Sequence, residues 1–182
     1  MSDYRPLGDR PKKQERNAAR VDGGRLQQID GLLDLAALYQ RGIPLRQWLV
    51  ADLIPMGNVT QLSGDGGLGK SLLALQLAVC AALQREWCGF PVMPCRSLLI
   101  FCEDDADEIM RRLYEVTMAY GATIEDIVEH IDIVSRVAEQ NGLVTFAPFG
   151  QELPKATPFY EKIKATVEAE NYGLIVADSS HD

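Results

Sequence analysis

The chain has 182 residues, which is enough for one domain with its own hydrophobic core. Its composition, 47% hydrophobic and 24% charged, is ordinary for a globular protein. A net charge of −8 argues against a surface that coats nucleic acid or membrane non-specifically, although it is compatible with a local basic loop. No apolar run approaches the ~20 residues of a membrane helix. Residues 4–25 are polar throughout, unlike a signal peptide.

The first residues differ from the remainder in charge. Residues 1–25 contain seven Lys and Arg and four Asp and Glu, a net charge of +3, so the remainder carries −11. They lack apolar periodicity, and we predict that residues 1–28 form a flexible charged tail, with a basic arm that touches nucleic acid as the alternative. Residues 29–182 then form the folded part.

The cysteines indicate the compartment. They contain no Cys-x-x-Cys pair, and only two histidines could join them, which argues against a zinc site. Reduced thiols in a cytoplasmic protein are the preferred interpretation. The four cysteines are Cys80, Cys88, Cys95 and Cys102.

Hydrophobic patterning predicts helices that alternate with strands. In chain order we expect a helix over residues 30–41, a turn at Pro55 and Gly57, a strand over 58–64, a helix over 70–83, a strand over 97–103, a helix over 104–121, a strand over 130–134, irregular chain over 135–157, a helix from Thr157 and a buried strand from Gly173. This alternation predicts an α/β fold, a parallel sheet with helices on both faces.

The stretch GDGGLGKS, residues 64–71, matches the P-loop pattern G-x-x-x-x-G-K-[ST]. Glycines tolerate positive φ and lack side-chain bulk, so several backbone N–H groups can surround a phosphate chain. The following helix adds the positive end of its dipole. The predicted nucleotide-binding residues are Gly64, Asp65, Gly66, Gly67, Leu68, Gly69, Lys70, Ser71 and Leu72.

Two side chains of this stretch carry the chemistry. Lys70 is expected to place its ammonium on the β- and γ-phosphates, and the Ser71 hydroxyl is suited to Mg²⁺. A second metal-site residue is predicted at Asp178, which follows the apolar run LIVA. The alternative for Asp178 is a strand-end carboxylate that caps a turn.

Hydrolysis also needs a group that activates water. Glu103 closes a predicted strand, and the carboxyl ends of parallel strands meet at one edge of the sheet. We therefore predict Glu103 as the general base, with Lys70 as the other catalytic residue. The alternative is that Glu103, Asp104 and Asp105 only cap the following helix. Both can hold, with Asp104 or Asp105 as the cap.

At this point the sequence resembles a known family. WLVADLIPMGNVTQLSGDGGLGKSLLALQLA, WCGFPVMPCRSLLIFCEDDADEIMRRL and GLIVADSS are similar to segments of RecA-like P-loop ATPases of the AAA family, in their RepA-type group of plasmid replicative hexameric helicases. The resemblance covers residues 48–182. It implies that residues 64–71 bind ATP and Mg²⁺, that Glu103 is the catalytic glutamate and Asp178 the second metal-site acid. It also implies a homo-hexamer that acts on single-stranded DNA.

The resemblance also implies segments that would follow Asp178. They include a strand between the P-loop strand and the Asp178 strand, DNA-facing loops, a γ-phosphate sensor and an arginine finger. We therefore expect this chain to be the N-terminal part of a RecA-like ATPase domain, truncated after its second nucleotide motif, with low stability of its own.

Other functions remain open from the sequence. A RecA-like regulatory ATPase without unwinding activity, a P-loop small-molecule kinase and a non-catalytic remnant are the alternatives to a helicase motor. His181 could approach the γ-phosphate, but a solvent-facing loop position is the preferred interpretation. Trp48 and Trp87 are interpreted as packing residues, with base stacking as the alternative, and Cys102 as a core residue of its strand.

Overall fold

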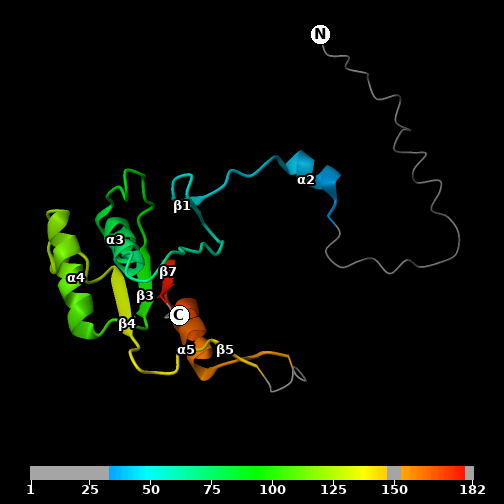
Figure 1. Cartoon of the computed structure of the whole chain (residues 1–182). Coiled ribbons are helices and arrows are strands. Elements are labelled where there is room, and N and C mark those ends of the chain that lie inside the picture. The colour runs from blue at the N-terminus through cyan, green and yellow to red at the C-terminus, as the bar shows by residue number, and fades with distance from the viewer. Residues whose placement is uncertain (1–32, 147–152, 179–182) are drawn as a thin grey trace, which may run out of the picture. The chain divides into compact units, whose positions relative to one another are not determined.

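The computed structural model describes residues 33–146 and 153–178 (Figure 1). The predicted tail, residues 1–28, and His181 lie outside the described residues. The chain divides into two compact units, Met1–Pro44 and Leu45–Asp182. The described element of the first unit is helix α2, Leu35–Arg41. Asp34 caps it by accepting from the amides of Ala36 and Ala37, and Gly42 ends it, as predicted.

The second unit is built on a parallel three-stranded sheet. Its strand order is β4 (Ile131–Ser135), β3 (Arg96–Phe101), β7 (Tyr172–Asp178). Helix α4 (Ala106–Ala119) connects β3 to β4, and helix α5 (Pro158–Ala169) connects β4 back to β7. The two crossovers run in opposite directions along the sheet, so right-handed connections place α4 and α5 on opposite faces. Figure 1 shows the three strands side by side in the order β4, β3, β7. The predicted α/β fold is confirmed.

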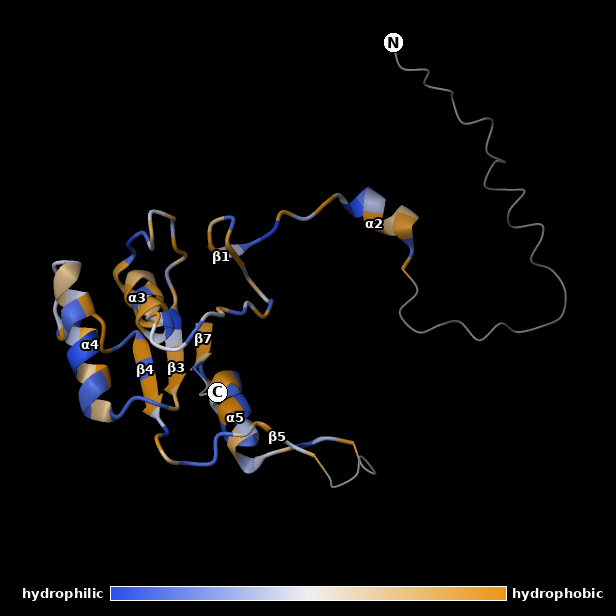
Figure 2. Cartoon of the chain, in the orientation of Figure 1, coloured by the Kyte–Doolittle hydropathy of each residue, from blue (hydrophilic) through white to orange (hydrophobic). Residues whose placement is uncertain are grey.

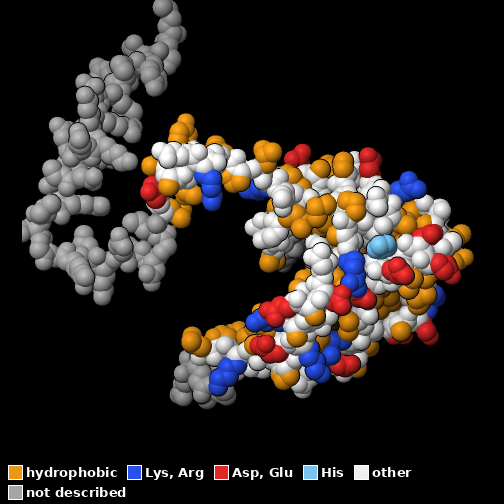
Figure 3. All heavy atoms as spheres, turned by 180° about the vertical axis from the view of Figure 1, so that it is seen from behind, with side chains coloured by type: hydrophobic (Ala, Val, Ile, Leu, Met, Phe, Trp, Pro, Cys, Tyr) orange, Lys and Arg blue, Asp and Glu red, His pale blue; other side chains and the backbone are white. Residues whose placement is uncertain are grey.

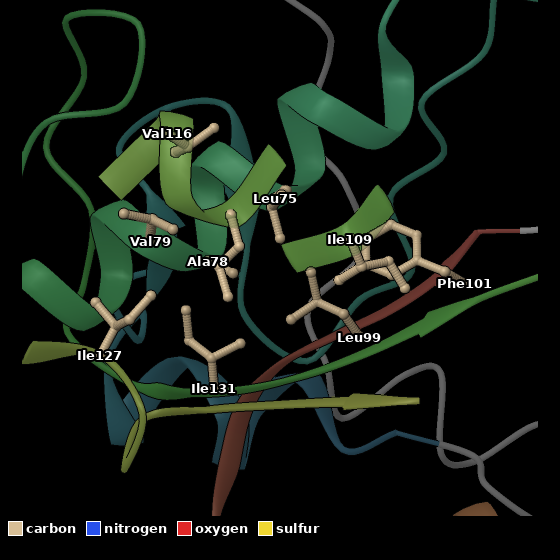
Figure 4. Close-up of a cluster of buried hydrophobic side chains, with 10 residues drawn as sticks. Leu75, Ala78, Val79, Leu99, Phe101, Ile109, Val116, Ile127 and Ile131 are labelled. Carbon is tan, nitrogen blue, oxygen red and sulfur yellow. The ribbon is translucent and has the colours of Figure 1, made fainter. Parts of the chain in front are cut away.

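The core lies between the sheet and helices α3 (Lys70–Leu83) and α4. Figure 4 shows its side chains pointing toward one another from α3, α4, β3 and the segment around Ile127 and Ile131. Residues 97–101 of β3 are at most 4% exposed, as expected of a strand covered on both faces. Figure 2 shows hydrophobic residues along the strands, whereas α4 is mixed in hydropathy. Its apolar stripe, which includes Ile109 and Leu113, is buried in this core.

Strand β7 contains a bulge that sets its register. Arg96 pairs with Tyr172 and Ser97 with Leu174, so Gly173 is an extra residue on β7. A Cβ atom at Gly173 would lie 2.4 Å from the Cβ of Cys95. The backbone at Gly173 is therefore too close to Cys95 for any residue with a side chain. From Leu174 onward the pairing is regular, and it ends with Phe101 opposite Asp178.

The remaining strands are short antiparallel pairs. Strand β1 (Trp48–Val50) pairs with β2 (Ile54–Pro55), and β5 (Val144–Thr145) pairs with β6 (Lys155–Ala156), within a region expected to be irregular. A 3₁₀ turn, η1, covers Ile124–Asp126. Trp87 packs on a second cluster formed by Leu49, Val50 and Leu77, and its indole N–H donates to the carbonyl of Leu73 at 3.1 Å. This contact agrees with a packing role.

The strand predicted over residues 58–64 is not formed. Its apolar anchors are exposed, Val59 by 100% and Leu62 by 51%. A strand is defined by the ladder it makes with a neighbour, and no described strand pairs with this segment. Residues 58–63 therefore lead into the glycine-rich loop without ladder hydrogen bonds. β-propensity alone did not reveal whether a partner backbone was present.

The surface gives two further facts. On the face drawn in Figure 3, acidic and basic side chains are interspersed rather than gathered by sign. Within the described ranges, no helix has the length and apolar character needed to cross a bilayer.

Candidate functional site

The glycine-rich loop, residues 64–69, leads directly into α3. Gly67 and Gly69 have φ angles of +76° and +82°, which L side chains rarely adopt. Gly69 is the N-cap of α3 and has no side chain to occupy the helix end. The first amides of a helix have no partner within it. The amides that follow Gly69 are thus available to an anion at the positive end of the helix dipole.

Lys70 is held by the loop that precedes it. Its Nζ donates to the carbonyl oxygens of Gly64 and Asp65, each at 2.9 Å. An ammonium has three donors, so these two bonds leave one N–H for a further acceptor. The loop therefore fixes the position of the positive charge beside its own backbone amides.

One cavity of about 880 Å³ joins this loop to the carboxyl edge of the sheet. That volume is within the range of small-molecule sites, roughly 300–1,000 Å³. Its lining contains most of the predicted residues, namely Gly64, Gly66, Gly67, Gly69, Lys70, Ser71, Leu72, Glu103 and Asp178. Asp65 and Leu68 are not in this lining. Asp65 contributes its carbonyl oxygen to Lys70, and Leu68 is 70% exposed beside a smaller neighbouring pocket.

Glu103 and Asp178 reach the cavity from adjacent strands. Asp178 pairs with Phe101 in the register of β7 and β3, and Glu103 follows Phe101 by two residues. The bulge at Gly173 is part of this alignment, since it decides which β7 residue stands opposite Phe101. Parallel pairing therefore brings together two carboxylates that are 75 residues apart in the sequence.

Cys102 directly precedes Glu103, and its interpretation as a strand core residue is wrong. Strand β3 ends at Phe101, and Cys102 is half-buried just beyond it. Burial raises the pKa of the Cys102 thiol, the charge of Asp178 raises it further, Arg136 opposes this and Glu103 adds to it. The thiol is thus close enough to the edge of the site to experience both carboxylates.

Capping and cavity lining are divided among the three acids that follow β3. Asp105 is the N-cap of α4 and accepts from the amide of Glu108 at 2.8 Å. Asp104 lines the cavity and pairs with Arg112 of α4. Glu103 lines the cavity and takes no part in the cap. The structure therefore agrees with the interpretation that both roles hold, with Asp105 as the cap and Glu103 at the cavity.

Sequence reasoning missed five residues of the cavity lining, namely Gln61, Leu62, Ser63, Asp104 and Arg112. Arg112 pairs with Glu108 at 2.8 Å, at the i,i+4 spacing that favours ion pairs on a helix surface. Its second pair, with Asp104, depends on how the chain turns between β3 and α4. Arg112 lies eight residues from Asp104, which is about two turns of a helix. This spacing could have suggested the pair, but it is not specific.

The residues suited to a metal are Ser71 and Asp178. Both line the cavity, and a hydroxyl and a carboxylate supply the hard oxygen ligands that Mg²⁺ takes. Among the described residues, no group of three or more His, Cys, Asp and Glu could hold a metal ion without other ligands. This donor set fits an ion that shares its coordination with phosphate oxygens and water.

Comparison with known proteins gives one family. The model of the AAA domain family matches residues 25–181, which is most of the chain. No curated protein and no solved structure matches the chain. The match includes the glycine-rich loop, α3, β3 with Glu103 just beyond its end, and β7 with Asp178. Because this model covers more than half of the chain, the chain belongs to the AAA domain family of P-loop ATPases.

Proposed function

We propose that this chain binds ATP with Mg²⁺ and hydrolyses it, as the motor domain of a RepA-type replicative DNA helicase. The observation that carries the proposal is that one cavity is lined by the glycine-rich loop and by the carboxylates of Glu103 and Asp178. A triphosphate needs amide donors and a cation on one side and an acid that orients water on the other. The cavity has each of these groups in its lining.

Binding would begin at the helix end. The amides after Gly69 would receive the phosphate oxygens, and the free N–H of Lys70 would reach the β- and γ-phosphates. Ser71 and Asp178 would hold Mg²⁺, which supplies neutralisation of the developing phosphate charge when it is bound. The carbonyl bonds of Lys70 keep the ammonium oriented before the nucleotide arrives.

Hydrolysis would depend on Glu103. Its carboxylate follows the end of β3 at the cavity wall, where it can accept a proton from the attacking water or orient it. Because Asp105 serves as the cap of α4, Glu103 is free for this role. Phosphoryl transfer is catalysed mainly by positioning and electrostatics, and these residues supply both.

The helicase assignment rests on the resemblance to the RepA-type group, whereas the family match supports the ATPase part of the proposal. That assignment includes single-stranded DNA as a partner and a homo-hexameric ring. A regulatory ATPase of the same fold would share the nucleotide site and lack the response to DNA. A small-molecule kinase would transfer the γ-phosphate to its substrate instead of releasing it as phosphate.

The test measures phosphate release from ATP by the whole protein, including any segments that follow residue 182, with and without Mg²⁺ and with and without single-stranded DNA. A helicase motor gives Mg²⁺-dependent release that single-stranded DNA stimulates severalfold. Release that DNA leaves unchanged would reject the motor and favour the regulatory ATPase. The absence of ATP binding by the wild-type chain would reject the nucleotide site as a whole.

A further inference from the structure

Arg112 is the cation of the cavity that the proposed chemistry does not use. It projects from α4, lines the cavity and is about one third exposed. Its Nη1 pairs with Oδ2 of Asp104, and its Nε pairs with Oε1 of Glu108 at 2.8 Å. One planar guanidinium therefore bridges the chain segment before α4 to the first turn of α4.

Asp104 is fixed from a second side. Its carbonyl oxygen accepts from the hydroxyl of Ser135, at the end of β4, at 2.9 Å. Asp105, the next residue, is tied to α4 by the cap bond to Glu108. Glu103 precedes this fixed pair and makes no hydrogen bond or ion pair of its own among the described residues. The direction of Glu103 thus depends on the segment that Arg112 and Ser135 hold.

The charges give a second reason for the bridge. Three carboxylates line the cavity, those of Glu103, Asp104 and Asp178, and a triphosphate would add further negative charge. Asp104 has only 17% of its side chain exposed, so an unpaired charge there would be poorly screened. Arg112 neutralises this carboxylate within the wall of the cavity.

We propose that Arg112 is a positioning residue of the nucleotide site: through its pair with Asp104 it holds the Glu103–Asp104 segment against α4 and thereby orients Glu103. This inference rests on the proposed function, because it assigns Glu103 its role in hydrolysis. The competing possibility is a direct contact between Arg112 and a phosphate. The two possibilities predict different effects of removing Arg112. Loss of a direct phosphate contact would lower ATP affinity, and it would not depend on Asp104.

The neighbouring arginine provides a matched control. Arg111 is also on α4 and pairs with Glu108, at 3.2 Å, but it is not part of the cavity lining. Arg111→Gln and Arg112→Gln each remove one guanidinium that contacts Glu108. Only Arg112→Gln also releases Asp104, so the difference between the two variants isolates that pair.

The first experiment does not require the protein to hydrolyse ATP. Hydrogen exchange is followed by mass spectrometry at the amides of Glu108 and Ile109, which donate to the side chain and carbonyl of Asp105. We expect Arg112→Gln to accelerate exchange there by about tenfold more than Arg111→Gln does. Equal exchange in the two variants would overturn the proposed clamp, whether or not the chain hydrolyses ATP.

The second arm separates kcat from KM. Arg112→Gln should lower kcat by about tenfold or more and change KM and ATP affinity by less than about threefold. Asp104→Asn should match it, and the double variant should be no slower than either single variant, because both remove the same pair. Independent, multiplicative losses, or a loss of ATP affinity with kcat preserved, would overturn the proposal. A wild-type chain that binds no ATP would instead reject the proposed function.

Discussion

Lys70 offers the most direct perturbation of the nucleotide site. Its ammonium donates to the carbonyl oxygens of Gly64 and Asp65, both at 2.9 Å, which leaves one N–H for the phosphate in the proposed function. Lys70→Ala removes that donor together with the positive charge. A hydrogen bond to a charged group contributes about 1.5–3 kcal/mol, so ATP affinity should fall roughly 10- to 150-fold.

The same substitution should leave the fold intact. Both carbonyl bonds of Lys70 are exposed, and water can replace the ammonium at Gly64 and Asp65. The free energy of unfolding should therefore change by less than about 0.5 kcal/mol. Loss of affinity without loss of stability would locate the effect at the phosphate contact.

Isothermal titration with ATP, in the presence of Mg²⁺, measures the affinity, and urea denaturation measures the stability. Lys164→Ala is the matched control, because this lysine lies on α5, pairs with Glu168 at 3.9 Å and is not in the cavity lining. An affinity of Lys70→Ala within about threefold of the wild type would refute the assignment of Lys70 to the phosphates.

Three further outcomes test other parts of the structure. Glu103→Gln should keep ATP affinity and lower kcat by about 100-fold or more, because the amide cannot take the proton; an unchanged kcat in phosphate-release assays would return Glu103 to a local structural role. Leu99→Ala, in the fully buried centre of the core, should lower the free energy of unfolding by about 2–5 kcal/mol in urea titrations, whereas Leu153→Ala, at 85% exposure, should change it little. The hydrogen bond with Cys80, followed by burial, raises the pKa of Tyr120 from 10.0 to about 12. The folded chain then retains a proton that the unfolded chain has lost, so the wild type should lose stability as pH rises from 10 toward 12, and Tyr120→Phe should lose less. Identical pH dependence of the two urea midpoints would contradict this.

The parts of the fold that the sequence predicted are those with local signals. Helix α3 begins and ends at the predicted residues, Lys70 and Leu83. Helix α5 was predicted from Thr157, which is its N-cap and accepts with its hydroxyl from the amide of Tyr160. Strands β3 and β7 were recognisable from continuous apolar runs. The glycine-rich loop was recognisable because its spacing and its following helix agreed with each other.

What the sequence did not predict depends on pairing between distant segments. Residues 58–64 have strand propensity, but no described strand lies beside them to complete a ladder. The short pairs β1–β2 and β5–β6 have too few residues for periodicity to register. Arg112 entered the site because the turn between β3 and α4 aligned it with Asp104, and no helix-surface rule contains that information.

Gly173 acts at a distance on the chemistry of the opposite end of its strand. Without the bulge, every later residue of β7 would shift by one position relative to β3. The side chains of β7 would then exchange the two faces of the sheet. Ala177 would then stand opposite Phe101, where Asp178 now stands. Natural variants at position 173 should be scarce for this reason, since even a methyl group there would collide with Cys95 and force the strand to shift.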